Sequence, residues 1–317
     1  MSPVIEIDNL ICRFGDFTAV KGLSFKIEKG QVLGFIGANG AGKTTTMRCM
    51  ATLESPTEGS IKVCGHNVIH EPAVVRKLIG WMPDDYGTYS NMNVYEYLDF
   101  FARAYGYKGT DRKDRVEEVM DFADLSPLAD RLTDKLSKGM SQRLCLGRTL
   151  LHDPEIMILD EPAAGLDPKA RLDFKRLVRI LAEEGKTLFI SSHILNELEE
   201  MCDSLLFIDQ GELVHHGTSE SLKQLNKQGV AMNIEIINDP EELKSWVEHN
   251  PGVQLISLEK NGAKVLFENE ENEFLASQLA KLINDGISVI TFKRDEYGLE
   301  ESFVNMINSR EDDNEGL

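Results

Sequence analysis

A short apolar run at residues 32–36 leads directly into a glycine-rich stretch and then into a helical pattern. The stretch fits the spacing G-x-x-x-x-G-K-[ST] in full. Its residues are Gly37, Ala38, Asn39, Gly40, Ala41, Gly42, Lys43 and Thr44, followed by Thr45. Glycines in such a loop let backbone N–H groups close around phosphate oxygens, while the lysine reaches the β and γ phosphates and the hydroxyl ligates Mg²⁺. The sequence therefore predicts a nucleotide site between a buried strand and a helix.

Two further runs, at residues 156–159 and 187–190, are also nearly all apolar. Such runs are typical of strands covered on both faces in a parallel sheet. Each of the three runs is followed by a helical pattern, over residues 43–50, 168–184 and 195–201. This alternation predicts an α/β fold with ligand-binding loops at the carboxyl ends of the strands. Residues 94–131 are helical in pattern throughout, so we expect an inserted helical subdomain at about residues 85–140.

Two adjacent acids, Asp160 and Glu161, close the second apolar run. Acids at the end of a buried strand are costly unless a cation or water meets them. Asp160 is therefore expected to hold Mg²⁺, directly or through a water, and Glu161 to polarise the attacking water as general base. His193 follows the strand expected at residues 187–192. It is a candidate for sensing the γ-phosphate at the same edge of the sheet.

Composition and charge restrict the possible partners and compartments. The 317 residues carry a net charge of −19, of which −12 lies in residues 231–317. Such a surface repels a phosphate backbone, so no nucleic-acid partner is expected. The sequence contains no apolar run of 18 residues and no signal-peptide pattern at its start, so we expect neither a membrane span nor a signal peptide. The five cysteines show no CxxC pairing and are expected to be reduced thiols of a cytosolic protein.

A polar stretch at residues 225–230 predicts a linker between an ATP-binding domain at residues 1–224 and a smaller domain at residues 231–309. The smaller domain is expected to contain strands at residues 231–237, 253–258, 263–267 and 287–293, with a hairpin turn at Asn261-Gly262. One helix is expected to open at Asp239-Pro240 and another to span residues 271–285. This β-α-β-β-α-β order is typical of a ferredoxin-like α+β domain. A last helix is expected at residues 299–307 and a disordered acidic tail at residues 310–317.

The stretch Leu136-Ser137-Lys138-Gly139-Met140-Ser141-Gln142-Arg143 lies between the two nucleotide motifs. It resembles the LSGGQ signature of ABC ATPases, which other NTPase families lack. Residues 165–167 match the D-loop of that family and His193 matches its switch histidine. Nearly all of residues 1–220 therefore look like the ATP-binding subunit of an ABC transporter. The resemblance implies a P-loop NTPase core that hydrolyses ATP with Mg²⁺, with Phe14 stacking on adenine and Val20 lining the same pocket.

The resemblance also implies a dimer. In this family two ATP molecules lie between head-to-tail subunits, and the signature of one subunit touches the γ-phosphate held by the other. Carried over to this chain, Ser137 and Gly139 would complete the partner's site, and Asp167 would reach across beside them. One isologous interface would then form two composite sites.

Two motifs depart from the family pattern, the signature and the Q-loop. Lys138 and Met140 replace a Gly and the Gln of the commonest signature, adding a cation near the trans phosphate and removing an amide. Asp84 occupies the Gln position of the Q-loop. A carboxylate can still ligate Mg²⁺, although its stem is one methylene shorter and it carries charge toward the γ-phosphate. Because the signature Ser and second Gly are kept, we expect the site to function.

The Q-loop region and the end of the chain are similar to the ATPase subunits of type-2 ABC exporters, which move drugs, sodium, polysaccharides or haem-related cargo. The resemblance rests on residues 83–87, 94–98, 286–290 and 299–303. In that subgroup a separate membrane permease provides the path, so the expected location is the cytoplasmic face of the cell membrane.

Two alternatives remain open at this point. A soluble ABC ATPase of translation or DNA repair commonly has two ATPase units, long insertions or basic surfaces, whereas this chain has one phosphate loop and negative charge. A catalytically silent binding module is opposed by the complete set Lys43, Asp160, Glu161 and His193. The cargo cannot be read from the sequence.

Overall fold

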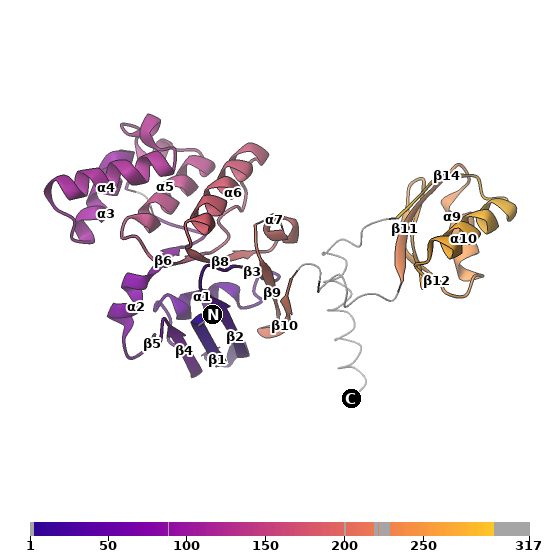
Figure 1. Ribbon diagram of the computed structural model, residues 1–317, viewed down its shortest axis with the longest axis horizontal. Helices are drawn as coiled ribbons and strands as arrows, with labels where there is room; N and C mark the ends of the chain where they lie inside the picture. The colour runs from indigo at the N-terminus through magenta and orange to yellow at the C-terminus, as the bar shows by residue number, and fades with distance from the viewer. Residues whose placement is uncertain (1–2, 88, 200, 219–220, 222–228, 295–317) are drawn as a thin grey trace. The chain divides into compact units, whose positions relative to one another are not determined.

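The structure is a computed structural model that describes residues 3–87, 89–199, 201–218, 221 and 229–294 (Figure 1). The chain divides into two compact units, Met1–Thr218 and Ser219–Leu317. The boundary lies six residues before the one expected from the sequence. Among the described residues, none of the helices combines the length and the apolar character that crossing a bilayer requires.

The first unit is built on a mostly parallel sheet with the strand order β10-β9-β3-β8-β7-β6. Strands β9, β3, β8, β7 and β6 run parallel to one another, whereas the edge strand β10 is antiparallel to β9. The strands are β3 (Val32–Ile36), β6 (Ile79–Met82), β7 (Ile156–Leu159), β8 (Thr187–Ser192), β9 (Ser204–Asp209) and β10 (Glu212–Gly217). Every residue of β3, β7 and β8 is buried. The three strands predicted from apolar runs are thereby confirmed.

A second, antiparallel sheet packs against the first and has the order β2-β1-β4-β5. Its strands are β1 (Pro3–Phe14), β2 (Phe17–Glu28), β4 (Glu58–Val63) and β5 (His66–Asn67). Phe25 of β2 meets Phe35 of β3 and Phe189 of β8, with ring centroids 6.3 Å and 5.8 Å away. These rings belong to a core that also buries Met47 and Met50 of helix α1 (Lys43–Met50). The core therefore fixes the helix that begins at the phosphate loop.

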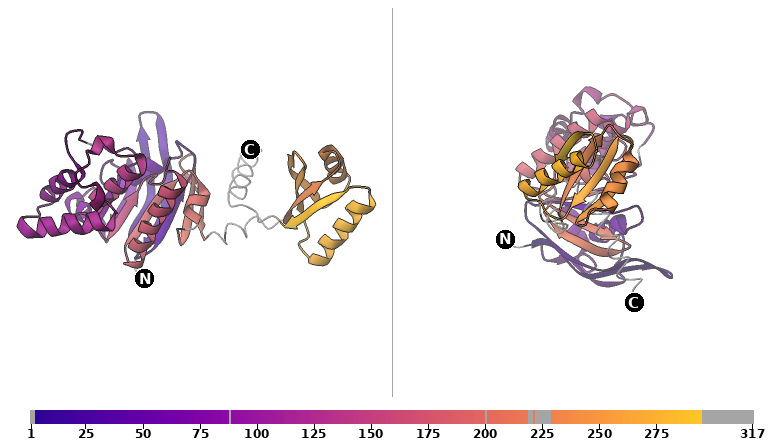
Figure 2. Two further views of the ribbon diagram at one scale, coloured as in Figure 1. Left: turned by 90° about the horizontal axis from the view of Figure 1, so that it is seen from above. Right: turned by 90° about the vertical axis from the view of Figure 1, so that its right-hand side faces the viewer.

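Three helices form the inserted subdomain and group together in Figure 1 and in the left view of Figure 2: α3 (Val94–Ala104), α4 (Gly109–Phe122) and α5 (Lys138–Leu150). Asn93 and Glu96 form a capping box at the start of α3. Short 3₁₀ turns at Ser126–Leu128 and Thr133–Lys135 join α4 to α5. The subdomain continues to Leu150, past the limit of about residue 140 expected from the sequence. The other helices of this unit are α2 (Pro72–Leu78), α6 (Pro168–Glu183) and α7 (Leu195–Glu199).

The second unit has the element order β11 (Val230–Ile236), α9 (Pro240–Glu248), β12 (Val253–Glu259), β13 (Gly262–Phe267), α10 (Asn272–Asn284) and β14 (Val289–Arg294). Its antiparallel sheet has the order β12-β13-β11-β14, which is the arrangement of a ferredoxin-like domain. Trp246 of α9 lies in its core and donates through Nε1 to Asp285 Oδ2 at 2.8 Å. The helix expected at residues 299–307, the tail at residues 310–317 and most of the linker lie outside the described residues.

Candidate nucleotide site

The glycine-rich loop joins the buried strand β3 to the amino end of α1, as the sequence predicts. Gly42 has φ of 105°, and a Cβ there would lie 2.6 Å from the Ala19 carbonyl oxygen. A Cβ at Gly37 would lie 2.4 Å from the Ile208 carbonyl oxygen. Glycine is therefore required at both ends of the loop, because β2 and β9 approach its backbone too closely for a side chain. The loop is a preformed turn of backbone N–H groups suited to phosphate oxygens.

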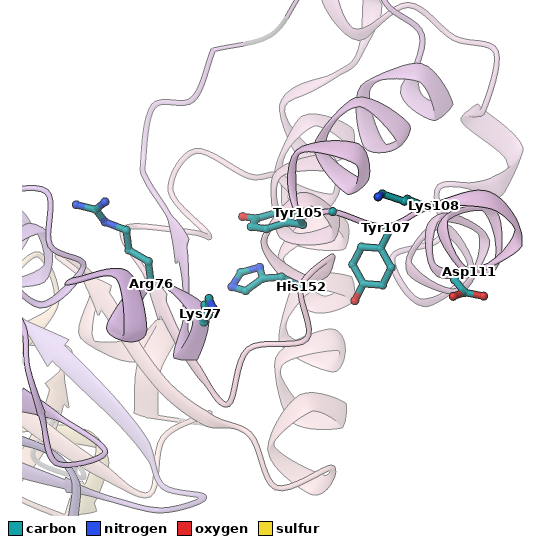
Figure 3. Close-up of a pocket in the computed structure, with 8 residues that line it drawn as sticks. Arg76, Lys77, Tyr105, Tyr107, Lys108, Asp111 and His152 are labelled. Carbon is teal, nitrogen blue, oxygen red and sulfur yellow. The ribbon is translucent and has the colours of Figure 1, made fainter. Parts of the chain in front are cut away.

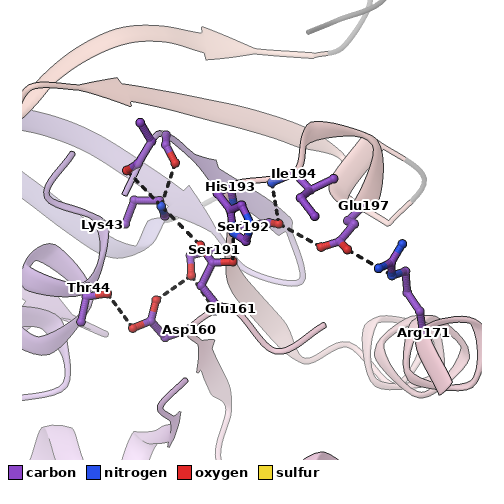
Figure 4. Close-up of polar contacts among 12 residues, drawn as sticks. Lys43, Thr44, Asp160, Glu161, Arg171, Ser191, Ser192, His193, Ile194 and Glu197 are labelled. Atoms are coloured by element: carbon purple, nitrogen blue, oxygen red, sulfur yellow. Dashed lines mark hydrogen bonds and ion pairs between the residues drawn. The ribbon is translucent and has the colours of Figure 1, made fainter. Parts of the chain in front are cut away.

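Lys43 is buried at the start of α1 and turns its ammonium back over the loop. Nζ donates to the Gly37 carbonyl oxygen at 2.7 Å and to that of Ala38 at 3.3 Å (Figure 4). It also lies 3.3 Å from Glu161 Oε1. One cation thus links the phosphate loop to the acid at the end of β7. A phosphate bound in the loop would compete with Glu161 for this ammonium.

Asp160 is 2% exposed and accepts hydrogen bonds from two hydroxyls. Thr44 Oγ1 donates to its Oδ2 at 2.8 Å, and Ser191 Oγ donates to its Oδ1 at 2.7 Å. The structure therefore brings together Thr44 and Asp160, two of the three residues predicted to hold Mg²⁺, at the edge of the sheet. A cation bound beside this carboxylate would offset the cost of burying it.

Glu161 has φ of 48°, an unusual conformation for a residue with a side chain. Its N–H donates to Ser191 Oγ at 2.8 Å, and its Oε2 lies 2.8 Å from His193 Nδ1. Ser191 therefore fixes the backbone of Glu161 and the carboxylate of Asp160 together. Ser191 was not predicted from the sequence, although a serine at the carboxyl end of an all-buried strand is a signal that could have found it.

Asp84 follows β6 closely and is near the same acids. Partial burial raises the pKa of its carboxyl group, and the charges of Asp160 and Glu161 raise it further, whereas Lys138 lowers it. The structure places the Lys138 ammonium over Gly165 of its own chain, where a Cβ would lie 2.6 Å from Nζ. Lys138 therefore contacts the D-loop in cis. The predicted approach of Lys138 to the partner's phosphate remains a prediction.

The residues predicted to act in trans all lie at the starts of helices. Ser137 caps α5 by accepting from the Met140 N–H at 3.4 Å, and Asp167 caps α6 by accepting from the Ala170 N–H at 2.9 Å. Gly139 packs so closely on α6 that a Cβ would lie 2.9 Å from Ala170 Cβ. Ser137 and Asp167 are exposed, so they are available to a second subunit.

The two residues predicted to meet adenine have different surroundings. Phe14 is 47% exposed at the end of β1, where it pairs with Phe17 across the hairpin. Val20 is fully buried and packs beneath the phosphate loop, where its Cγ2 would lie 3.4 Å from a Cβ at Gly42. Phe14 therefore offers a surface to a ligand, whereas Val20 supports the loop from inside the core.

Comparison with known proteins decides the family. Residues 20–164 match the model of the family described as "ABC transporter". An ABC transporter ATP-binding protein of Bacillus subtilis, YxlF, is 32% identical over 306 residues, covering 96% of this chain and 100% of the relative. The chain belongs to the ABC transporter ATP-binding family. It is an ATPase with the P-loop NTPase fold.

Other ABC relatives and structures agree with this assignment. The bacitracin transport ATP-binding protein BcrA of Bacillus licheniformis is 32% identical over 308 residues, covering 97% of this chain and 98% of its own. A solved structure titled as the ATP-binding subunit of an ABC transporter is 26% identical, with a TM-score of 0.64, over 70% of this chain and 92% of the other. These relatives favour the transporter interpretation and give no support to a soluble ATPase of translation or DNA repair.

A cavity of about 800 Å³ opens elsewhere on this ABC ATPase, where α2 and the loop after α5 face the helical subdomain (Figure 3). Tyr105 stacks on His152 with ring centroids 4.5 Å apart. The cavity is lined mainly by basic and aromatic residues: Arg76, Lys77, Tyr105, Gly106, Tyr107, Lys108, Asp111 and His152. Three lysine or arginine side chains gather here on a chain of net charge −19. None of the lining residues was predicted to bind ATP.

Proposed function

We propose that this chain is the ATP-hydrolysing subunit of an ABC exporter, acting as a dimer beneath a separate membrane permease at the cytoplasmic face of the cell membrane. The observation that carries the proposal is the geometry at the strand ends. Lys43 and His193 each contact the Glu161 carboxylate. The neighbouring Asp160 accepts hydrogen bonds from Thr44 and Ser191. The printed names of relatives support export, since they include linearmycin resistance and Nod factor export ATP-binding proteins.

Thr44 and Asp160 are suited to hold Mg²⁺. Their side-chain oxygens are hard ligands 2.8 Å apart at the start of α1 and the end of β7. Asp84 would add a third oxygen from beyond β6. When bound, Mg²⁺ would neutralise charge on the β and γ phosphates of ATP. Its charge would also offset the repulsion among the acids that raises the pKa of Asp84.

Glu161 is placed to accept a proton from water. Among the described residues, its buried Oε1 has no hydrogen-bond donor, although the Lys43 ammonium lies 3.3 Å away. When ATP draws Lys43 to its phosphates, Oε1 becomes available to a water at the γ-phosphate. His193 holds the other oxygen at 2.8 Å and so orients the carboxylate.

A second copy of the chain would complete the site. The exposed Ser137 and Asp167, together with Gly139 near the start of α5, would face the γ-phosphate held by the partner's loop. The positive end of α5 favours an anion there. Dimerisation would thus depend on ATP, because the phosphates join the two surfaces.

The cavity of about 800 Å³ that is lined by Arg76, Lys77 and Lys108 is the surface that we assign to the permease. Its cations, from α2 and the start of α4, fit an acidic and aromatic loop of the membrane subunit. The lining residues come from α2 and from the helical subdomain. A movement of the subdomain relative to α2 would therefore displace a permease loop bound between them.

Co-expression with a candidate permease, sought among the neighbouring genes, tests the proposal. We expect the two proteins to co-purify from membranes, and ATP hydrolysis to drive cargo out of the cell or into inverted vesicles. An Arg76→Glu/Lys77→Glu variant should lose the permease while its basal ATPase activity remains. The matched control is Lys26→Glu, which changes an exposed cation on β2. Purification with ribosomes and not with membranes would contradict the proposal.

A further inference from the structure

A continuous polar path joins the D-loop to the loop that carries His193, and Figure 4 shows the part of it from Arg171 to Ile194. Arg171 on α6 donates through Nη2 to the Leu166 carbonyl oxygen at 3.4 Å. Its Nε lies 3.1 Å from Glu197 Oε1 on α7. The other oxygen of Glu197 accepts from Ser192 Oγ at 3.0 Å. The Ser192 hydroxyl in turn accepts from the N–H of Ile194 at 3.0 Å.

The two ends of this path are functional segments. Leu166 precedes Asp167, which caps α6 and is expected to reach the partner subunit. Ser192 and Ile194 flank His193, whose ring lies 2.8 Å from the Glu161 carboxylate. A displacement of the D-loop would therefore be passed through the side chains of Arg171, Glu197 and Ser192 to the residue that orients the general base.

We propose that Arg171 and Glu197 are positioning residues that couple the D-loop to His193, so that contact with the partner subunit aligns Glu161 for hydrolysis in the same chain. The coupling to the partner rests on the proposed function. The connection within one chain does not, because all of its distances lie inside the first unit.

The carboxylate end of this ion pair is buried, whereas the Arg171 side chain is 34% exposed. The Glu197 side chain is 4% exposed and Ser192 is 3% exposed, so water does not readily replace a lost contact. A buried carboxylate that loses its cation is left with an uncompensated charge. Nε of Arg171 and Oε1 of Glu197 approach without hydrogen-bond geometry. Charge therefore holds the guanidinium against the Glu197 carboxylate, so that a movement of the D-loop would shift both side chains.

Arg171→Met and Glu197→Gln test the proposal because both keep the approximate side-chain volume. We expect each variant to bind ATP within about threefold of wild type and to lower kcat by about 10- to 100-fold, the range for misplacing a reacting group. KM should change little, since the lost alignment acts in the transition state. The double variant should be no slower than the slower single variant, because both changes break one path.

Arg112→Met is the matched control, because Arg112 also pairs with a largely buried carboxylate, Asp99, at 2.6 Å, but in the helical subdomain. It should lower thermal stability without lowering kcat. Arg171→Lys keeps the charge and should restore part of the rate if Arg171→Met proves unstable.

Folded variants with kcat within twofold of wild type, or with multiplying effects in the double variant, would overturn the relay. A wild-type protein that hydrolyses ATP without forming an ATP-dependent dimer would instead contradict the proposed function. A slow Arg171→Met enzyme would then still support the relay within one chain.

Discussion

At the scale of single residues, Glu161 is the expected general base and also has a strained backbone. Its φ of 48° costs on the order of 1–2 kcal/mol for a residue with a side chain. The hydrogen bond from its N–H to Ser191 and the contact of its carboxylate with His193 hold it in that conformation. The strain aims the carboxylate toward Lys43 and the phosphate loop, where an attacking water would be activated.

Glu161→Gln keeps the shape of this side chain but removes its basicity. We expect ATP binding to persist while hydrolysis slows by roughly 10²–10⁴-fold, the contribution of a general base. ATP should then accumulate a stable dimer, measurable by size-exclusion chromatography with light scattering. Turnover at the wild-type rate would contradict the assignment of Glu161.

Lys43→Ala removes the cation that lies on the phosphate loop. The variant should lose at least about tenfold in ATP affinity, equivalent to 1.4 kcal/mol, because the phosphates lose their main side-chain cation. Calorimetric titration with ATP measures the loss. Lys186→Ala is a suitable control, since Lys186 pairs with Asp153 away from the phosphate loop. Equal affinities in wild type and Lys43→Ala would remove the phosphate-loop interpretation.

At the scale of elements, local sequence predicts the strands and helices that carry the site, but not every contact between them. The apolar runs at β3, β7 and β8 were found because both faces of each strand are buried. The antiparallel sheet was missed, and the pairing that joins its two hairpins is non-local, for example Ile5 of β1 with Val63 of β4. Arg171 and Glu197 were missed as well, since each looks like an ordinary charge on a helix until the fold brings them together.

His152, in the loop after α5, makes a non-local contact that should make the stability of the fold depend on pH. His152 Nε2 lies 3.0 Å from the Ile79 carbonyl oxygen, so Nε2 carries the hydrogen. Its Nδ1 is buried without a partner among the described residues. Burial lowers the pKa of this imidazole, and Arg115 and Lys186 lower it further, although the bond to Ile79 and the charge of Asp153 oppose the shift.

The unfolded chain therefore binds the proton of His152 more tightly than the folded chain does. The stabilisation that the neutral, buried His152 gives to the folded state is complete above the ordinary imidazole pKa of about 6.5. It is lost as the pH falls below that value. We expect the difference in melting temperature between wild type and His152→Phe to shrink, or to reverse in favour of the variant, between pH 7.5 and 5.5. Comparing the two proteins cancels the effects of the other histidines. A constant difference would contradict the prediction.

At the scale of the whole molecule, the composite site predicts that two inactive variants can restore each other. Lys43→Ala damages the loop that binds ATP in cis, and Ser137→Arg damages the surface that meets ATP in trans. In a heterodimer, one site carries both lesions and the other carries neither. Mixed proteins should regain roughly a quarter of wild-type turnover if the sites act independently. The absence of recovery, with heterodimers shown to form, would count against trans assembly.

The division into two units predicts that ATP binding needs only the first. The residues of the nucleotide site all lie before Thr218, and the second unit has its own core around Trp246, Phe267 and Leu282. A chain ending at Thr218 retains β10 and every strand that supports the phosphate loop. We propose that the second unit regulates the dimer or supports it. Its loss should therefore change the hydrolysis rate or the dimer lifetime while leaving ATP affinity within about threefold of that of the full chain, a difference of less than 1 kcal/mol.

Calorimetry on the full chain and on the truncated chain measures this difference directly. A second truncation ending at residue 224 guards against loss of β10 at the new terminus, where the ends of chains fray. The melting temperature of each truncated protein reports whether the first unit is still folded. In a folded truncation, a loss of more than about tenfold in ATP affinity, or 1.4 kcal/mol, would mean that the second unit contributes to the ATP pocket itself. Unchanged affinity with an altered hydrolysis rate would instead assign it to the step after binding, where two subunits must meet.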